Sequence, residues 1–346
     1  MSNQIRPATR DGPAGSTRPA VCVLCGPGGD RPPLLDRLAP IADIRYAEDA
    51  REALRDTDVL FAWDFASHSL REGWDGAERL RWVHVAAAGV DRLLFPELVH
   101  SDVVVTNARG VFDQPIAEHV LACILAHAKD LYRSRDLQRE RRWQHRETAN
   151  IRGACVLVVG TGAIGRAIAR LLRAVGMEVR GAGRRARDGD PDFGSVLASN
   201  DLAAHVPDVD YLVLAAPLTP QTRGLIDARV LSRMKPTAYL VNVGRGACVV
   251  QSALREALAE GRLAGAALDV FEREPLPSGD PLWEAPGMFV SPHMSGDFSG
   301  SLERLAEQFI DNLHRWTSGR PLLNVVDKSL GFVDSMPDGD KREGAV

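Results

Sequence analysis

The sequence has no long hydrophobic run, and no apolar stretch approaches the roughly 20 residues that a helix needs to span a bilayer. Its first 19 residues are polar and rich in Pro, Gly, Ser and Arg, without the apolar segment of a secretion signal. We expect residues 1–19 to form a disordered tail, and residues 329–346, rich in Gly and Asp, to form a loose one. These features predict a cytoplasmic protein.

Cysteine is scarce, with five among 346 residues, and the net charge is only -4. Cys22 and Cys25 form a C-x-x-C pair, which can be redox-active or bind zinc, but no second pair or His-x-His partner follows at metal spacing. We therefore expect buried structural thiols and no metal. Acidic and basic residues are mixed along most of the chain, so no large field would recruit nucleic acid or a membrane surface. The expected partner is a small molecule.

Short apolar runs alternate with helical patterns in both halves of the chain. A chain of 346 residues exceeds the size of one ordinary domain, so two domains are expected. Alternation of strands and helices predicts a parallel sheet with helices on both faces in each of them. The expected strands span residues 20–24, 58–61, 80–85, 103–106, 155–159, 179–182, 211–215, 238–242 and 265–269.

Three longer segments have helical patterns. Apolar residues recur at three- and four-residue spacing over 115–131, which predicts a long helix. Residues 133–147 carry charges of both signs, which favours a solvated or subunit-contacting helix over a phosphate-binding one. The pattern over 301–318 predicts a helix that returns the chain to the first domain.

The stretch VLVVGTGAIG contains Gly160, Gly162 and Gly165 as G-x-G-x-x-G, between an apolar strand and an amphipathic helix. The first glycine allows a tight turn, the second allows a pyrophosphate to approach, and the third allows helix and strand to pack closely. The helix N-terminus adds N–H donors and a partial positive charge. This context predicts dinucleotide binding.

The end of the next strand reads Gly183-Arg184-Arg185. Enzymes that use NAD place there a carboxylate that accepts hydrogen bonds from the ribose hydroxyls. Here no carboxylate is present, and arginine binds phosphate in bidentate fashion. The pattern favours NADP as the preferred cofactor, with NAD possible; a solvated basic turn is the alternative.

Several further motifs carry a family resemblance. They read WVHVAAAGVDRLLFPEL (82–98), TNARGVFDQPIAEHV (106–120), AAPLTPQTRGLI (215–226), YLVNVGRGACV (239–249), ALDVFEREPLP (267–277) and SPHMSG (291–296). Between about residues 20 and 328 the chain resembles the D-2-hydroxyacid dehydrogenase family, in its glyoxylate/hydroxypyruvate reductase-like branch. The resemblance implies an α/β fold of two Rossmann-like domains and a homodimer formed through the cofactor domain. That cofactor domain, 108–298, would be inserted into a flavodoxin-like substrate domain made of 20–107 and 299–328.

The resemblance also implies a catalytic set. Its catalytic arginine matches Arg245, its glutamate Glu274 and its acid/base histidine His293. Arg245 would hold the substrate carboxylate and polarise the carbonyl, His293 would supply a proton, and Glu274 would favour the charged imidazole and fix its tautomer. Singly, each residue has a structural alternative, but their joint occurrence at the family's motif positions favours catalysis.

Further contacts are implied by the same matches. The loop residues Ala87, Ala88 and Gly89 would bind the substrate carboxylate, and Trp63 matches a position near the active site, with domain packing as an equal alternative. The additional cofactor contacts would be Thr161, Ala163, Ile164, Ala216, Pro217, Val243 and Asp269.

The expected function is hydride transfer from NAD(P)H to C2 of a small 2-oxo acid. Two alternatives stay open: reduction of an imino acid by the same residues, and a non-catalytic dinucleotide sensor. Retention of Arg245, Glu274 and His293 argues against the sensor.

Overall fold

The chain forms two compact units in a computed structural model that describes residues 18–64 and 69–334. Along the sequence, unit 2 interrupts unit 1. Of the residues expected in the substrate domain, 87–94, 107, 299–301 and 326–328 make their contacts within unit 2. Of the described residues, unit 1 comprises 18–64, 69–86, Phe95–Thr106 and Leu302–Val325. Unit 2 comprises Ala87–Leu94, Asn107–Ser301 and 326–334.

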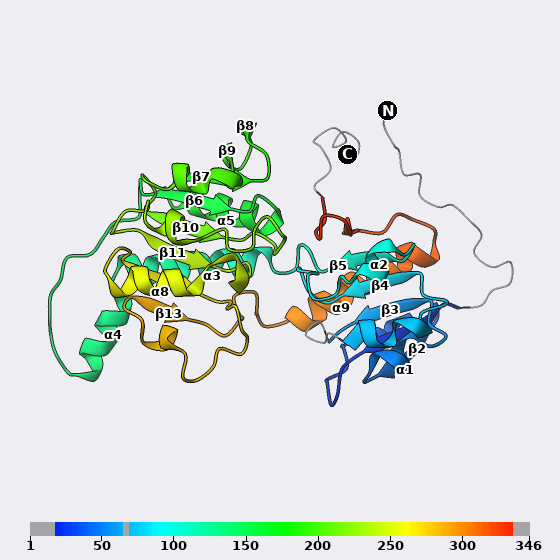
Figure 1. Cartoon of the computed structure of the whole chain (residues 1–346). Helices are drawn as coiled ribbons and strands as arrows, with labels where there is room; N and C mark the ends of the chain where they lie inside the picture. Colours follow the sequence, from blue (N-terminus) through cyan, green and yellow to red (C-terminus); the bar gives the residue numbers. More distant parts are fainter. Residues whose placement is uncertain (1–17, 65–68, 335–346) are drawn as a thin grey trace. The chain divides into compact units, whose positions relative to one another are not determined.

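Unit 1 is built on a five-stranded sheet of order β2-β1-β3-β4-β5, which is the flavodoxin-like order that the resemblance implied (Figure 1). Its pairs β1–β2, β1–β3 and β3–β4 are parallel. The strands are β1 (Ala20–Leu24), β2 (Asp43–Ala47), β3 (Val59–Ala62), β4 (Trp82–Val85) and β5 (Val104–Asn107). Short helical segments connect them: η1 (Leu35–Leu38), α1 (Ala50–Leu54), η2 (Ser69–Gly76) and α2 (Pro96–His100).

The helix predicted near the C-terminus is present as α9 (Ser301–Thr317) and packs on this sheet. Its buried Phe309 stacks on Phe61 of β3, with ring centroids 4.2 Å apart, and on Trp82 of β4, at 5.6 Å. The apolar face of α9 thereby completes the core of unit 1 with residues more than 200 positions earlier in the chain. None of the helices in the described part of the chain is long and apolar enough to cross a membrane.

Unit 2 is built on an eight-stranded sheet of order β13-β12-β11-β10-β6-β7-β9-β8. All its pairs are parallel except the antiparallel pair β8–β9. The strands are β6 (Cys155–Val159), β7 (Glu178–Gly183), β8 (Arg187–Asp190), β9 (Gly194–Ala198), β10 (Tyr211–Leu214), β11 (Tyr239–Asn242), β12 (Gly265–Leu268) and β13 (Met288–Val290).

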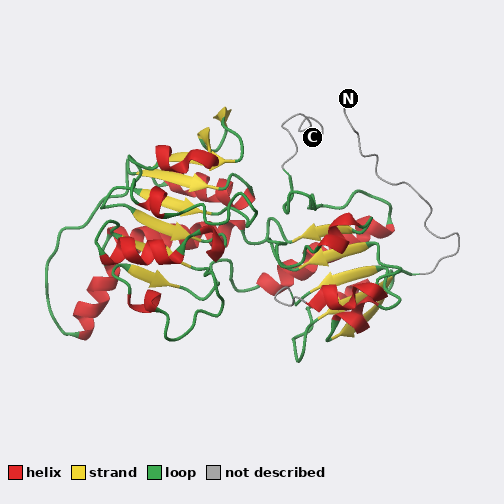
Figure 2. Cartoon of the chain, viewed as in Figure 1, coloured by secondary structure: helices red, strands yellow, loops and turns green. Residues whose placement is uncertain are grey.

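Helices cover this sheet on two faces, as Figure 2 shows. Alternate residues of β6 point to opposite sides, so Val156 and Val158 enter one core and Leu157 and Val159 the other. The first core is closed by α3 (Asp113–Ala128) and α5 (Ala163–Ala174). The second is closed by α6 (Leu202–His205), α7 (Ala228–Leu231) and α8 (Gln251–Ala259).

The strand order of unit 2 reverses between β6 and β10, which are neighbours in the sheet although 51 residues separate their ends in sequence. In open α/β sheets, ligands bind at such a switch point, beyond the carboxyl ends of the strands. The loops that follow β6, β7, β10, β11 and β12 are therefore the place to look for a site.

Candidate active site

The glycine loop lies between β6 and α5 in a form that suits a dinucleotide. Gly160 has a φ of +106°, which favours glycine, and a Cβ on Gly165 would overlap the carbonyl oxygen of Gly160. A Cβ on Gly162 would meet no atom within 4 Å, and no side chain caps the start of α5. Open space beside an uncapped helix N-terminus fits a pyrophosphate.

The other predicted cofactor segments meet this loop at the same edge of the sheet. Gly160 N–H donates to the carbonyl of Ala182 over 2.8 Å, and a Cβ on Gly183 would lie 3.0 Å from Oγ1 of Thr161. A Cβ on Gly160 would lie 2.7 Å from the nitrogen of Ala216. The loops after β6, β7 and β10 are thus in contact. The predicted Ala163 and Ile164 begin α5, Pro217 follows Ala216, and Val243 follows β11.

Arg184 and Arg185 are exposed on the turn that follows β7. The guanidinium of Arg184 lies 5.6 Å from the ring centroid of Phe332. A hydrogen bond from Ser329 is the main reason that the pKa of Asp327 lies below its ordinary value, and the charge of Arg184 adds to it. Arg184 therefore lies beside an aromatic ring and near a carboxylate, with its charge accessible to solvent.

Arg245 follows β11 and is fixed by two hydrogen bonds. Its Nε donates to Oδ1 of Asp91 over 2.9 Å, and its Nη1 donates to the carbonyl of Gly244 over 2.9 Å. A Cβ on Gly89 would overlap Nη2, so this loop glycine lies directly against the guanidinium. Asp91 was not selected from the sequence.

His293 and Glu274 form a second pair. His293 Nδ1 and Glu274 Oε2 are 2.8 Å apart, while Oε1 accepts the N–H of Phe271 over 3.0 Å. Arg92 Nη2 also donates to Oε2, over 3.1 Å. Burial alone would raise the pKa of Glu274, but the hydrogen bonds from His293 and Phe271 and the charge of Arg92 outweigh it. The pKa of Glu274 therefore lies below its ordinary value, and the group is a carboxylate at neutral pH.

Asp269 lies at the end of β12, where its carboxylate holds the loop that carries His293. Oδ1 accepts from Oγ of Ser291 over 2.6 Å and from the N–H of Met294 over 2.9 Å. Oδ2 accepts from the N–H of Ser295 over 3.0 Å. Its predicted hydrogen bond to the cofactor stays a prediction; in the structure both oxygens bind this loop.

The predicted substrate residues fall in both units. Ala87, Ala88 and Gly89 follow β4 and belong to unit 2, and the carbonyl of Ala88 accepts from Nδ2 of Asn107 over 2.6 Å. Trp63 belongs to unit 1, where it packs edge-on against Phe61 with centroids 5.4 Å apart. Its role toward substrate stays a prediction.

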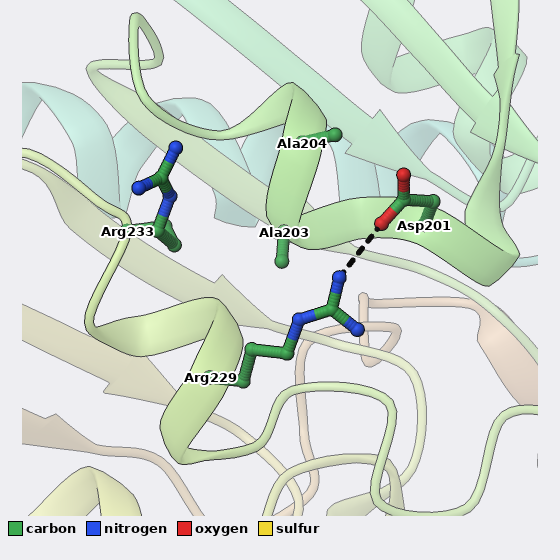
Figure 3. A pocket seen from close by; sticks show the side chains of 5 residues that line it. All are labelled: Asp201, Ala203, Ala204, Arg229 and Arg233. Atoms are coloured by element: carbon green, nitrogen blue, oxygen red, sulfur yellow. Dashed lines mark hydrogen bonds and ion pairs between the residues drawn. The ribbon is translucent and has the colours of Figure 1, made fainter.

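One surface hollow of about 310 Å³ lies elsewhere in unit 2 (Figure 3). Arg229 Nη2 donates to Asp201 Oδ1 there over 3.0 Å, and the guanidinium of Arg233 points away from that pair. Ala203 and Ala204 complete the lining, and no predicted site residue takes part. In residues 18–64 and 69–334, no group of His, Cys, Asp or Glu is arranged to hold a metal ion, and the cysteines are free thiols.

Comparison with known proteins adds the family context. The profile described as D-isomer specific 2-hydroxyacid dehydrogenase, NAD binding domain, matches residues 121–295. A glyoxylate reductase of Korarchaeum cryptofilum is 33% identical over 267 residues, which are 75% of this chain and 80% of the relative.

Two solved structures are similar over nine-tenths of the chain. A D-isomer specific 2-hydroxyacid dehydrogenase family protein of Aeromonas salmonicida is 31% identical with a TM-score of 0.78, over 90% of this chain and 100% of the other. An NADPH-dependent glyoxylate/hydroxypyruvate reductase of Sinorhizobium meliloti, solved with NADP and sulfate, is 26% identical with a TM-score of 0.78, over 91% and 100%.

Proposed function

This chain belongs to the D-isomer specific 2-hydroxyacid dehydrogenase family, and on that premise we propose that it reduces a small 2-oxo acid of the glyoxylate or hydroxypyruvate kind, with NADPH as the preferred reductant. Membership makes it an NAD(P)-dependent oxidoreductase acting on the CH–OH group of 2-hydroxy acids. The observation that carries the proposal is the short loop 87–94. Its consecutive residues Asp91 and Arg92 bind Arg245 and Glu274, so one loop gathers the proposed catalytic residues.

Each proposed role follows from the chemistry of the side chain. Arg245, held at Nε by Asp91 and at Nη1 by Gly244, directs Nη2 toward the loop at Gly89, where it binds the substrate carboxylate. Bound NADPH supplies the hydride that C2 receives. His293 donates the proton that the carbonyl oxygen takes up.

Glu274 determines which nitrogen of His293 does this. Because the carboxylate accepts a hydrogen bond from Nδ1–H, Nε2 is left to act on the substrate, and it makes no hydrogen bond within the part of the chain that the structure describes.

The preference for NADPH rests on the turn after β7. Arg184 and Arg185 are exposed beside the glycine loop, and no carboxylate occupies the turn 183–185 to repel a 2′-phosphate. The relative from Sinorhizobium meliloti was solved with NADP, which supports the same choice.

We also propose a homodimer formed through unit 2. The charged helix α4 (Leu131–Arg139) and the segment 140–150 that follows it project from the body of unit 2 (Figure 1). Trp143 in this segment is fully exposed, and Leu131 and Tyr132 are about half exposed. Exposed apolar side chains on a projecting arm can be buried by a second subunit. Light scattering should give a dimer mass, and a monomer mass at micromolar concentration would contradict the proposal.

Turnover of a panel of 2-oxo acids tests the function. Glyoxylate, hydroxypyruvate, pyruvate and longer 2-oxo acids are each incubated with NADPH or NADH, with and without ammonia or an amine. The proposal predicts reduction without ammonia and a higher kcat/KM with NADPH. Turnover that requires the amine would identify an imino acid reductase, and no turnover of any acid would favour a dinucleotide sensor.

A further inference from the structure

The backbone of His293 has a conformation that its own residue type does not favour. Its φ is +53°, in the left-handed region that costs free energy for any residue with a Cβ. Neighbouring hydrogen bonds must therefore hold it. His293 N–H donates to the carbonyl of Asp269 over 2.8 Å, and the side chain of Asp269 binds the N–H groups of Met294 and Ser295. Asp269 thus holds the segment that orients the imidazole.

The side chain of Asp269 has a third partner, Ser291, and Ser291 in turn lies near His119. Ser291 Oγ lies 2.6 Å from Asp269 Oδ1 and 3.4 Å from Nε2 of His119 on α3. A serine hydroxyl has one proton, and the much shorter distance assigns it to the carboxylate. The Ser291 oxygen is then an acceptor toward His119, so Nε2 of His119 carries a proton and donates it.

His119 is a neutral donor in this arrangement. It is half buried on α3, and burial lowers its pKa, against the opposing charge of Asp269. A neutral imidazole with its proton on Nε2 donates a hydrogen bond to the Ser291 oxygen. It orients the Ser291 hydroxyl without bringing a positive charge near the Asp269 carboxylate. The oxygens of Asp269 accept the N–H groups of Met294 and Ser295 in the same arrangement.

We propose that His119 is a positioning residue for His293, acting through Ser291 and Asp269. It fixes the Ser291 hydroxyl toward Asp269, and Asp269 holds His293 in its left-handed conformation. The inference rests on the proposed function, because it assumes that His293 transfers the proton. His119 itself contacts no reacting atom in this account.

Three variants test the chain of contacts. His119→Phe keeps the ring shape and removes the donor, Ser291→Ala removes the link, and His119→Gln keeps an N–H donor at a similar reach. His119→Phe and Ser291→Ala should each lower kcat about three- to tenfold, the range for one hydrogen bond. KM for the 2-oxo acid and Kd for NADPH should stay within about twofold. His119→Gln should retain most of the wild-type kcat.

A double variant shows whether the two residues act in series. His119→Phe combined with Ser291→Ala should be no worse than Ser291→Ala alone, because both remove the same support. Additive losses, a wild-type kcat in either single variant, or a glutamine variant as poor as the phenylalanine one would overturn the inference. If His119→Phe fails to fold, Ser291→Ala and His119→Gln still decide it.

His293→Ala separates this inference from the proposed function. If His293→Ala retains turnover, the proposed function fails. If His293→Ala loses turnover while His119→Phe and Ser291→Ala keep it, only the positioning role fails.

Discussion

Gly89→Ala is expected to damage the proposed substrate site while leaving the fold intact. A Cβ at this position would overlap Nη2 of Arg245 and lie 2.7 Å from its Cζ. The neighbour is the far end of a flexible side chain, and Gly89 does not have a positive φ, so the backbone accepts alanine. The guanidinium of Arg245 must move instead.

The expected magnitude follows from what Arg245 loses. A displaced guanidinium cannot keep its 2.9 Å bond to Asp91 and also present Nη2 to a substrate carboxylate. One charge-assisted hydrogen bond contributes about 1.5–3 kcal/mol, which is roughly tenfold to a hundredfold in kcat/KM. The cost to folding should stay below about 1 kcal/mol, since no buried contact of the core is removed.

Steady-state kinetics on glyoxylate with NADPH, beside urea unfolding, would measure both quantities. Gly76→Ala is the matched control, because a Cβ there meets no atom within 4 Å. The control should keep wild-type kcat/KM. A Gly89→Ala enzyme within about twofold of wild type would refute the placement of Arg245, and a large loss of stability would show that the backbone yields instead.

Three other outcomes are expected. Arg245→Lys should lower kcat/KM at least tenfold, close to Arg245→Ala, because one ammonium cannot bind Asp91 and a carboxylate together; a lysine variant near wild type would place Arg245 outside the site. Gly183→Asp with Arg184→Ala should raise KM for NADPH by roughly tenfold to a hundredfold and shift preference to NADH; equal kcat/KM for the two cofactors in the wild type at low salt would contradict this. Burial lowers the pKa of His84 to about 3. Below about pH 6.5, His84 is therefore protonated in the unfolded chain but stays neutral in the folded chain. The free energy of unfolding consequently falls with decreasing pH, by about 3 kcal/mol at pH 4. His84→Phe should flatten that decline in urea unfolding at pH 7 and pH 4, and an unchanged decline would mean that other groups cause it.

Local patterns in the sequence were sufficient to predict most of the strands and the longer helices. Continuous apolar runs predicted β1 and β6 at their observed bounds, since both are buried central strands. β2 was missed because it lies at the sheet edge and only Ala47 is buried. The mixed-charge helix was predicted to 147 but α4 ends at Arg139, because Leu137 is its one buried residue and no apolar face continues it.

Contacts between site residues that lie far apart in the sequence could not be predicted from local patterns. Asp91 and Arg92 stood in the quoted motif 82–98, but they lie 154 and 182 positions from the residues that they bind, and the motif does not indicate those partners. His119 stood in a quoted motif, but its relation to Ser291 arises only when α3 packs beside the sheet. The left-handed backbone of His293 likewise has no signal in the residue type.

The most direct test of the account is the turnover of His293→Ala, measured as NADPH consumed with glyoxylate or the best acid of the panel. Loss of a general acid should lower kcat by roughly a hundredfold to ten-thousandfold. Kd for NADPH should change little, and His314→Ala, which alters an exposed histidine of α9, should behave as wild type. Wild-type turnover by His293→Ala would contradict the assignment of His293 as the proton donor.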